Sequence, residues 1–132
     1  MNKKTRAGAS RSFEELLERM KRERYGKVPA ALELLARSDP EFTEKYDDLF
    51  QLLMTRDRTL TVKSKELMVI GILASKGEYD GLKEHIDRAL TIGVSRRAII
   101  EALELAMLYG GGAPSLVFGG LALIDSLKMR GG

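Results

Sequence analysis

Two residues in this sequence have side chains suited to acid–base chemistry: Glu66 and His85, the only histidine in the chain. A histidine oriented by a carboxylate is a common general acid or base near neutral pH. Glu66 opens the most apolar segment and shares a helical face with Ile70 and Leu73, four and seven residues further on. An unpaired buried carboxylate costs on the order of several kcal/mol, so we expect Glu66 either to pair with a donor or to have a raised pKa. Two antiparallel helices joined through residues 77–80 would bring it to His85.

The same pair also has a structural interpretation. A half-buried histidine bonded to a glutamate is often a satisfied polar contact that takes no part in a reaction. The residues alone leave both interpretations open.

Other kinds of chemistry are excluded by the residues that the chain lacks. It contains no cysteine, which excludes disulfides, thiolate metal sites and thiol redox chemistry. No carboxylates cluster at metal-ligand spacing around the single histidine, so we expect no metal site. The glycines at 110–112 lack the Lys-Ser/Thr of a phosphate-binding loop, and they indicate a corner between helices.

The elements that must position Glu66 and His85 are predicted to be helices. Apolar residues recur at helical spacing, and no segment shows the two-residue alternation of a half-buried strand. Start signals stand at Ser12, at Asp39-Pro40, at Thr61 or Ser64, and at Ser95, while glycines mark the ends. We predict an all-α fold of six to seven helices in a single domain over residues 12–130, with helices over about 12–24, 30–36, 40–55, 63–76, 80–92, 96–109 and 114–129.

The most apolar predicted helix has a distinctive composition. From Leu67 to Ala74 it is apolar on every side, which is typical of a helix in the middle of a bundle. The composition changes at about Thr61, where we place the start of the core of the fold.

The charge of the chain is concentrated at its start. Residues 1–11 carry four basic residues and no acid, so the remaining 18 basic and 19 acidic residues nearly balance. We interpret 1–11 as a flexible basic leader and expect no nucleic-acid partner, because no downstream helix has a clustered basic face. The leader has no apolar segment of a signal peptide, and the longest uncharged apolar stretch, Leu67 to Ser75, is too short to span a membrane. We expect a cytoplasmic protein.

Several short motifs follow one another in the second half of the chain. They are Ser64-Lys65-Glu66-Leu67, then His85 followed by Ala89-Leu90 and Gly93-Val94-Ser95, then Ile100-Glu101-Ala102 and Tyr109-Gly110-Gly111 with Pro114. In this order and spacing they resemble the carboxymuconolactone decarboxylase family, which also contains the alkylhydroperoxidase D-like proteins. The resemblance covers about residues 45–128. It implies an all-helical fold and a homo-oligomer, either a trimer or a hexamer built from dimers.

The resemblance also separates two branches of chemistry. The peroxidase branch uses a Cys-x-x-Cys before the family histidine, and those positions fall here on Glu78 and Gly81. Without a thiolate, a thiol peroxidase would need a partner protein to supply the sulfur. Carried over to this chain, the family histidine is His85 and the family glutamate is Glu66.

The decarboxylase branch lacks the cysteine pair and keeps the histidine. Its substrate is a small carboxylated lactone that accepts the electrons released with CO2, so the resemblance implies that no cofactor is needed. His85 and Glu66 are then the candidate catalytic residues. Arg88, on the same side of the predicted helix as His85, is the candidate for binding the substrate carboxylate, and Tyr109 the candidate for lining the pocket.

Purely structural roles remain open for these residues. Arg88 also fits a solvated surface arginine, and Tyr109 fits a residue that packs the core. The alternative function is a non-catalytic small-molecule-binding protein or a structural oligomer of the same family. The triplet 110–112 before Pro114 departs from the Gly-x-Pro spacing usual in the family, so the shape of the pocket is not transferred.

Overall fold

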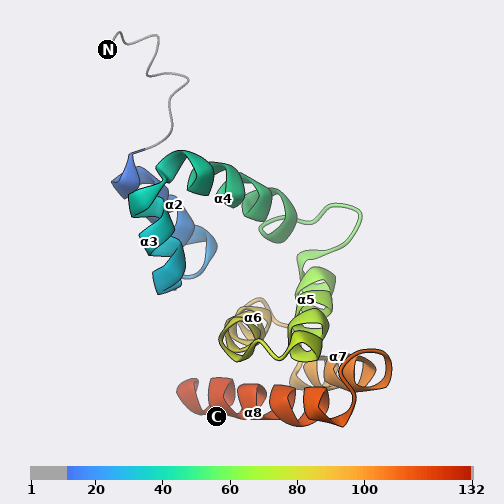
Figure 1. The fold of residues 1–132 in the computed structure, drawn as a ribbon. Helices are drawn as coiled ribbons and strands as arrows, with labels where there is room; N and C mark the ends of the chain where they lie inside the picture. Colours follow the sequence, from blue (N-terminus) through green and yellow to red (C-terminus); the bar gives the residue numbers. More distant parts are fainter. Residues whose placement is uncertain (1–11, 132) are drawn as a thin grey trace, which may run out of the picture. The chain divides into compact units, whose positions relative to one another are not determined.

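The computed structural model describes residues 12–131, and this part of the chain is helical, without a strand. The all-α prediction is therefore confirmed. The helices are α2 (Phe13–Glu23), α3 (Ala30–Ser38), α4 (Pro40–Met54), α5 (Val62–Lys76), α6 (Tyr79–Thr91), α7 (Arg96–Tyr109) and α8 (Ala113–Met129) (Figure 1). The predicted leader at 1–11 lies outside the described residues.

The helices begin where the sequence carries capping side chains. Ser12, Asp39 and Ser95 each accept a hydrogen bond from the backbone N–H three residues further on. Of the two residues considered for the start of α5, Thr61 is the cap, and its hydroxyl accepts from the backbone N–H of Ser64 at 3.1 Å. These local hydrogen bonds explain why the predicted helix starts lie within two residues of the observed ones.

Glycines end two of the helices for identifiable reasons. Gly77 closes α5 in the left-handed conformation, at φ 73°, which a residue with a side chain rarely adopts. Gly110 and Gly111 form the corner between α7 and α8, where a Cβ atom would overlap the side chains of Ser75 and Ser115. The close approach of α5 to this corner therefore needs glycine.

The chain divides into two compact units at Arg56 and Asp57. The boundary lies close to the change of composition predicted at Thr61. Within the N-terminal unit, α2, α3 and α4 contact one another. Its apolar core consists of Leu16, Met20, Leu32 and Ala36. A single domain over residues 12–130 stays a prediction.

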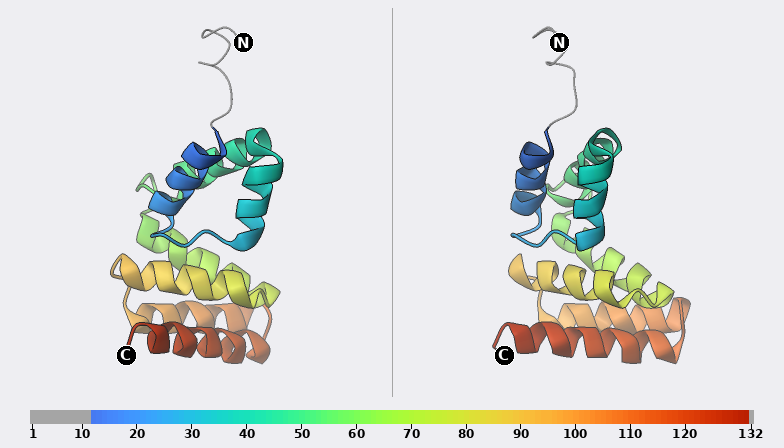
Figure 2. Two further views of the ribbon diagram at one scale, coloured as in Figure 1. Left: turned by 90° about the vertical axis from the view of Figure 1, so that its left-hand side faces the viewer. Right: turned by 60° about the vertical axis from the view of Figure 1, so that its left-hand side comes forward.

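The C-terminal unit is a bundle of four helices. In it α5 contacts α6, α7 and α8, and α8 lies beside both α6 and α7 (Figure 2). The core between them is fully buried at Ile70, Leu82, Ile86 and Ile99.

The helix α5 is central to this bundle, as predicted, but it is not buried on every side. Met68 and Ile72 on its outer face are 55% and 56% exposed. The expectation from its all-round apolar composition is therefore wrong for this face, which the other helices of the C-terminal unit leave open.

Candidate functional site

Glu66 and His85 lie in direct contact in the C-terminal unit. The His85 Nδ1 atom is 2.7 Å from Glu66 Oε2, although the two residues stand 19 positions apart on α5 and α6. The Glu66 side chain is completely buried, whereas 20% of the His85 side chain is exposed. The structure thus forms the pair that the sequence predicted, with the carboxylate inside and the imidazole at the surface.

Arg88 completes the arrangement from the inside. It follows His85 by one helical turn on α6, and its Nε donates a hydrogen bond to Glu66 Oε1 at 3.0 Å. The arginine is itself buried, at 8% exposure. Both oxygens of Glu66 therefore have a donor, which satisfies a carboxylate that burial would otherwise destabilise. We refer to Glu66, His85 and Arg88 as the Glu66 triad.

This position differs from the role expected for Arg88. The sequence suggested that it binds the carboxylate of a substrate, and in the structure it binds the carboxylate of Glu66. The reason is that α5 and α6 pack against each other, so that the guanidinium of Arg88 reaches across to the Glu66 carboxylate on α5. Binding of a substrate by Arg88 stays a prediction.

The hydrogen-bond network assigns the protons on the His85 ring. Because Glu66 accepts from Arg88 on one oxygen, its other oxygen is an acceptor for the Nδ1–H of His85. The second ring nitrogen, Nε2, makes no hydrogen bond within residues 12–131. One ring nitrogen is therefore held by the carboxylate, and the other is left to give or take a proton on a side chain that is 20% exposed.

The helix that carries His85 is fixed on both sides. Leu82, Ile86 and Ala89 are fully buried against the rest of the bundle. On its other flank, Ser126 of α8 donates a hydrogen bond from Oγ to the Lys83 carbonyl at 3.3 Å. The ring of His85 is thus positioned by a rigid helix, which favours a defined geometry for proton transfer.

Tyr109 lies elsewhere on the C-terminal unit. It is 85% exposed at the end of α7 and lines a groove of about 790 Å³ between α5 and α7. No member of the Glu66 triad lines this groove. The structure therefore brings together three of the four predicted site residues and leaves Tyr109 apart from them, so its role in a substrate pocket stays a prediction.

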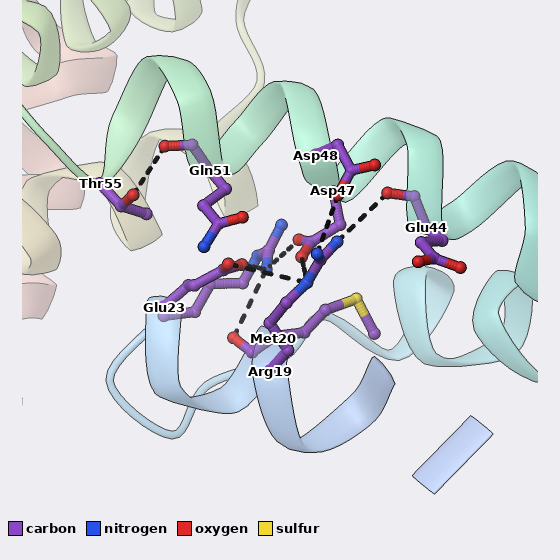
Figure 3. Close-up of polar contacts among 9 residues, drawn as sticks. Arg19, Met20, Glu23, Glu44, Asp47, Asp48, Gln51 and Thr55 are labelled. Atoms are coloured by element: carbon purple, nitrogen blue, oxygen red, sulfur yellow. Dashed lines mark hydrogen bonds and ion pairs between the residues drawn. The ribbon is translucent and has the colours of Figure 1, made fainter. Parts of the chain in front are cut away.

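Sequence reasoning missed a second set of buried charges, in the N-terminal unit (Figure 3). Arg19 of α2 donates from Nε to Asp47 Oδ2 and from one terminal nitrogen to Asp48 Oδ1, both at 2.8 Å. Arg24 lies 2.7 Å from the other oxygen of Asp47, which is completely buried. We refer to Arg19, Glu23, Arg24, Asp47 and Asp48 as the N-terminal charge cluster.

Glu23 gives this cluster a titratable group. Burial, followed by the hydrogen bond and the charge of Asp47, raises the pKa of the Glu23 carboxyl to about 7, against the opposing charges of Arg19 and Arg24. The signal for this cluster in the sequence is weak. Arg19 stands between Leu16 and Met20 on the apolar face of its helix, which is the one hint of its burial.

The described residues contain neither a candidate metal site nor a candidate membrane span. No group of three or more histidine, aspartate or glutamate side chains between residues 12 and 131 is arranged to hold a metal ion. None of the helices in the same range has the length and apolarity of a membrane span.

Known structures share the fold of this chain. A carboxymuconolactone decarboxylase described as putative, from Burkholderia xenovorans, is 22% identical, with a TM-score of 0.78 over 89% of this chain and 93% of its own. A protein of the same family from Legionella pneumophila is 22% identical, with a TM-score of 0.67 over 88% of this chain and 95% of its own. A third, from Thermotoga maritima and described as possibly involved in antioxidative response, is 24% identical, with a TM-score of 0.57 over 91% and 93%. At these identities the likeness concerns the fold.

Comparison of the sequences is decisive for the family. No curated protein gives a significant match to the chain. The sequence model of the carboxymuconolactone decarboxylase family matches residues 40–117, which is more than half of the chain and contains all of the Glu66 triad. This chain belongs to the carboxymuconolactone decarboxylase family.

Proposed function

We propose that this protein is a cofactor-free lyase that decarboxylates a small carboxylated lactone or a related ring-cleavage product, with His85 as the proton donor. The observation that carries the proposal is the His85 ring itself. Its Nδ1 is 2.7 Å from an oxygen of a buried carboxylate, its Nε2 has no hydrogen-bond partner in residues 12–131, and 20% of the side chain is exposed. Family membership supports the reaction class.

The chemistry needs one proton and an electron acceptor. The bond between the ring carbon and the carboxylate breaks, CO2 leaves, and the electron pair passes into the lactone carbonyl to form an enolate. The protonated Nε2 of His85 then gives its proton to the ring carbon that lost CO2. Solvent afterwards restores the proton to the imidazole. Because the substrate holds the electrons, the reaction needs no cofactor.

The other members of the triad have supporting roles in this proposal. Glu66 orients the imidazole through its contact with Nδ1. Arg88 holds Glu66 in place through Oε1. A substrate carboxylate at Arg88 and a pocket lined by Tyr109 remain part of the proposal, as do a cytoplasmic location and assembly into a trimer or hexamer.

The test is turnover of carboxymuconolactone, followed by the release of CO2. We expect His85→Ala to lower kcat about 10²- to 10⁴-fold, which is the usual contribution of a positioned general acid. The matched control is Lys83→Gln, which changes a charged residue two positions away on the same helix and leaves the triad intact. Unchanged turnover in His85→Ala would contradict the proposal.

A second function has one observation in its favour. Glu66 is completely buried and both of its oxygens are bonded within the chain, as in a purely structural polar contact. A non-catalytic binding protein or structural oligomer of the family would then tolerate replacement of the whole triad by apolar residues, since no polar group would be left without a partner. The variant Glu66→Leu/His85→Leu/Arg88→Met would keep the stability of the wild type, and the wild type would release no CO2 from any carboxylated lactone.

A further inference from the structure

The surface of the C-terminal unit contains an apolar groove that the Glu66 triad does not use. Small residues of α5 and α7 line it, including Gly71, Ala98 and Ala102. Large side chains line it as well, among them Met68, Ile72 and Leu105, each between 55% and 56% exposed. A groove lined by small and large apolar residues of two helices is suited to receive a row of large side chains from a third helix.

The N-terminal unit presents such a row. Phe42, Tyr46, Leu49 and Leu53 lie on one face of α4, at intervals of four, three and four residues, and are between 47% and 60% exposed. We call these four residues the α4 stripe. The side of α4 that packs inside its own unit is a different one, marked by the buried Thr43 and Asp47. The stripe is therefore an apolar face left over after the unit has folded.

We infer that the α4 stripe of one copy of this chain docks into the α5/α7 groove of a second copy, so that two chains exchange α4 reciprocally. Of the two assemblies included in the proposed function, this contact fits the hexamer built from dimers and not the trimer, and it does not depend on the reaction at His85.

The lengths of the two surfaces agree. The stripe spans twelve residues of α4, from Phe42 to Leu53, and the groove spans twelve residues of α7, from Ala98 to Tyr109. At the rise of an α-helix both are about 16 Å long. The α7 face also repeats the intervals of the stripe, with Ala98, Ala102, Leu105 and Tyr109 at four, three and four residues.

The charges at the edges are complementary. Lys45 flanks the stripe one turn before Leu49, and Glu101 lines the groove among apolar residues. Neither side chain has an ion-pair partner within residues 12–131. A docked stripe would offer each of them an opposite charge.

The area is that of a stable dimer. At about half exposure, four side chains of this size present roughly 400 Å² of surface, since large apolar side chains bury about 150–250 Å² each. Two stripes and the two groove surfaces that they cover then amount to about 1,600 Å², which is the standard size of a specific protein–protein interface.

The experiment measures the mass of the full-length chain in solution by light scattering during gel filtration. We expect the wild type to be a dimer or a multiple of it, and we expect Leu49→Asp and Ile72→Asp each to shift it to a monomer. The controls are Leu34→Asp and Met129→Asp, which place the same charge on residues that are 63% and 67% exposed outside the stripe and the groove, and which should keep the wild-type mass. Circular dichroism checks that each variant is folded.

Mixing the two variants identifies the partner of the stripe. A Leu49→Asp chain keeps an intact groove and an Ile72→Asp chain keeps an intact stripe, so the mixture should form a heterodimer through one good contact. Restored association after mixing supports the inference. A wild-type mass for Leu49→Asp would overturn it, since the groove would then face another groove or a different ligand. Failure of the mixture to associate would also overturn it, since the stripe would then pack within its own chain.

A charge exchange provides a second measurement with a smaller perturbation. Lys45→Glu should weaken the association at least severalfold, and combining it with Glu101→Lys should restore it. A wild type that releases CO2 but remains a monomer would overturn this inference and leave the proposed function intact. A wild-type dimer that is inactive toward carboxylated lactones would contradict the proposed function and leave this inference intact.

Discussion

Asp47 in the N-terminal unit and Glu66 in the C-terminal unit are both completely buried, and both are bonded to arginine. Their hydrogen-bond networks differ in the side chains that they contain and in whether one of those side chains is exposed. The N-terminal charge cluster joins two arginines to three carboxyl groups and contains no histidine. The Glu66 triad instead ends in an imidazole that is 20% exposed.

This difference separates a structural role from a chemical one. Buried ion pairs hold helices in register, and they lose much of their Coulombic gain to desolvation. A site for proton transfer needs in addition a group that exchanges protons near neutral pH and meets the substrate. Of the two clusters, only the Glu66 triad contains an imidazole, and 20% of that side chain is exposed, which is why the proposed function rests on it.

The largest expected effect breaks the N-terminal cluster. Asp47→Ala leaves Arg19 and Arg24 without their shared buried carboxylate, so we expect the free energy of unfolding to fall by about 3–5 kcal/mol. Urea denaturation followed by circular dichroism measures it. The control is Asp48→Ala, because the Asp48 side chain is 56% exposed and should contribute less than about 1 kcal/mol. Equal losses in the two variants would contradict a structural role for the buried pair.

A smaller effect is expected when the carboxylate of the triad is neutralised. Glu66→Gln keeps the shape of the side chain, and Arg88 loses a charged partner, so we expect a loss of about 1–3 kcal/mol. The amide N–H₂ would then face His85 and turn its Nδ1 into an acceptor, which moves the ring proton to Nε2. Because His85 is the only histidine, ¹⁵N NMR of the imidazole shows this change in a single pair of signals. An unchanged tautomer would show that Glu66 does not orient the ring.

The pH dependence of stability distinguishes the clusters further. The pKa of Glu23 is about 7 in the folded chain and about 4.5 in the unfolded chain, so the folded state holds the proton more tightly. Stability is then complete below about pH 4.5 and falls as the pH rises through 7, by on the order of 1–2 kcal/mol. Glu23→Gln should remove most of this fall between pH 5 and pH 8 in urea titrations. A wild type whose stability rises over this interval would contradict the shift.

The smallest effect sets the baseline for both clusters. Arg37 and Glu33 form an exposed ion pair on α3, with a distance of 3.6 Å and side-chain exposures of 64% and 44%. Since solvent screens such a pair, Glu33→Gln should change the free energy of unfolding by less than about 0.5 kcal/mol. Thermal denaturation at low and high salt measures it. A loss as large as that of Asp47→Ala would mean that burial does not explain the difference between these pairs.

The helices of this protein follow from its sequence alone. Ser12, Asp39 and Ser95 cap the helices that they were predicted to start, and Gly77 ends α5, because each of these signals acts on backbone groups only three or four residues away. The contact of Glu66 with His85 was also predictable, since the two helices are neighbours joined by a short turn and a buried carboxylate needs a donor.

Tertiary structure alone decided the rest. Arg88 bonds to Glu66, and Arg19 bonds to Asp47 across 28 positions of the sequence, because a long flexible side chain pairs with whichever charge the packing of the helices brings within reach. Spacing along one helix does not contain that information. For the same reason the all-round apolar composition of α5 did not show which face the fold would leave open, and Met68 and Ile72 lie on it.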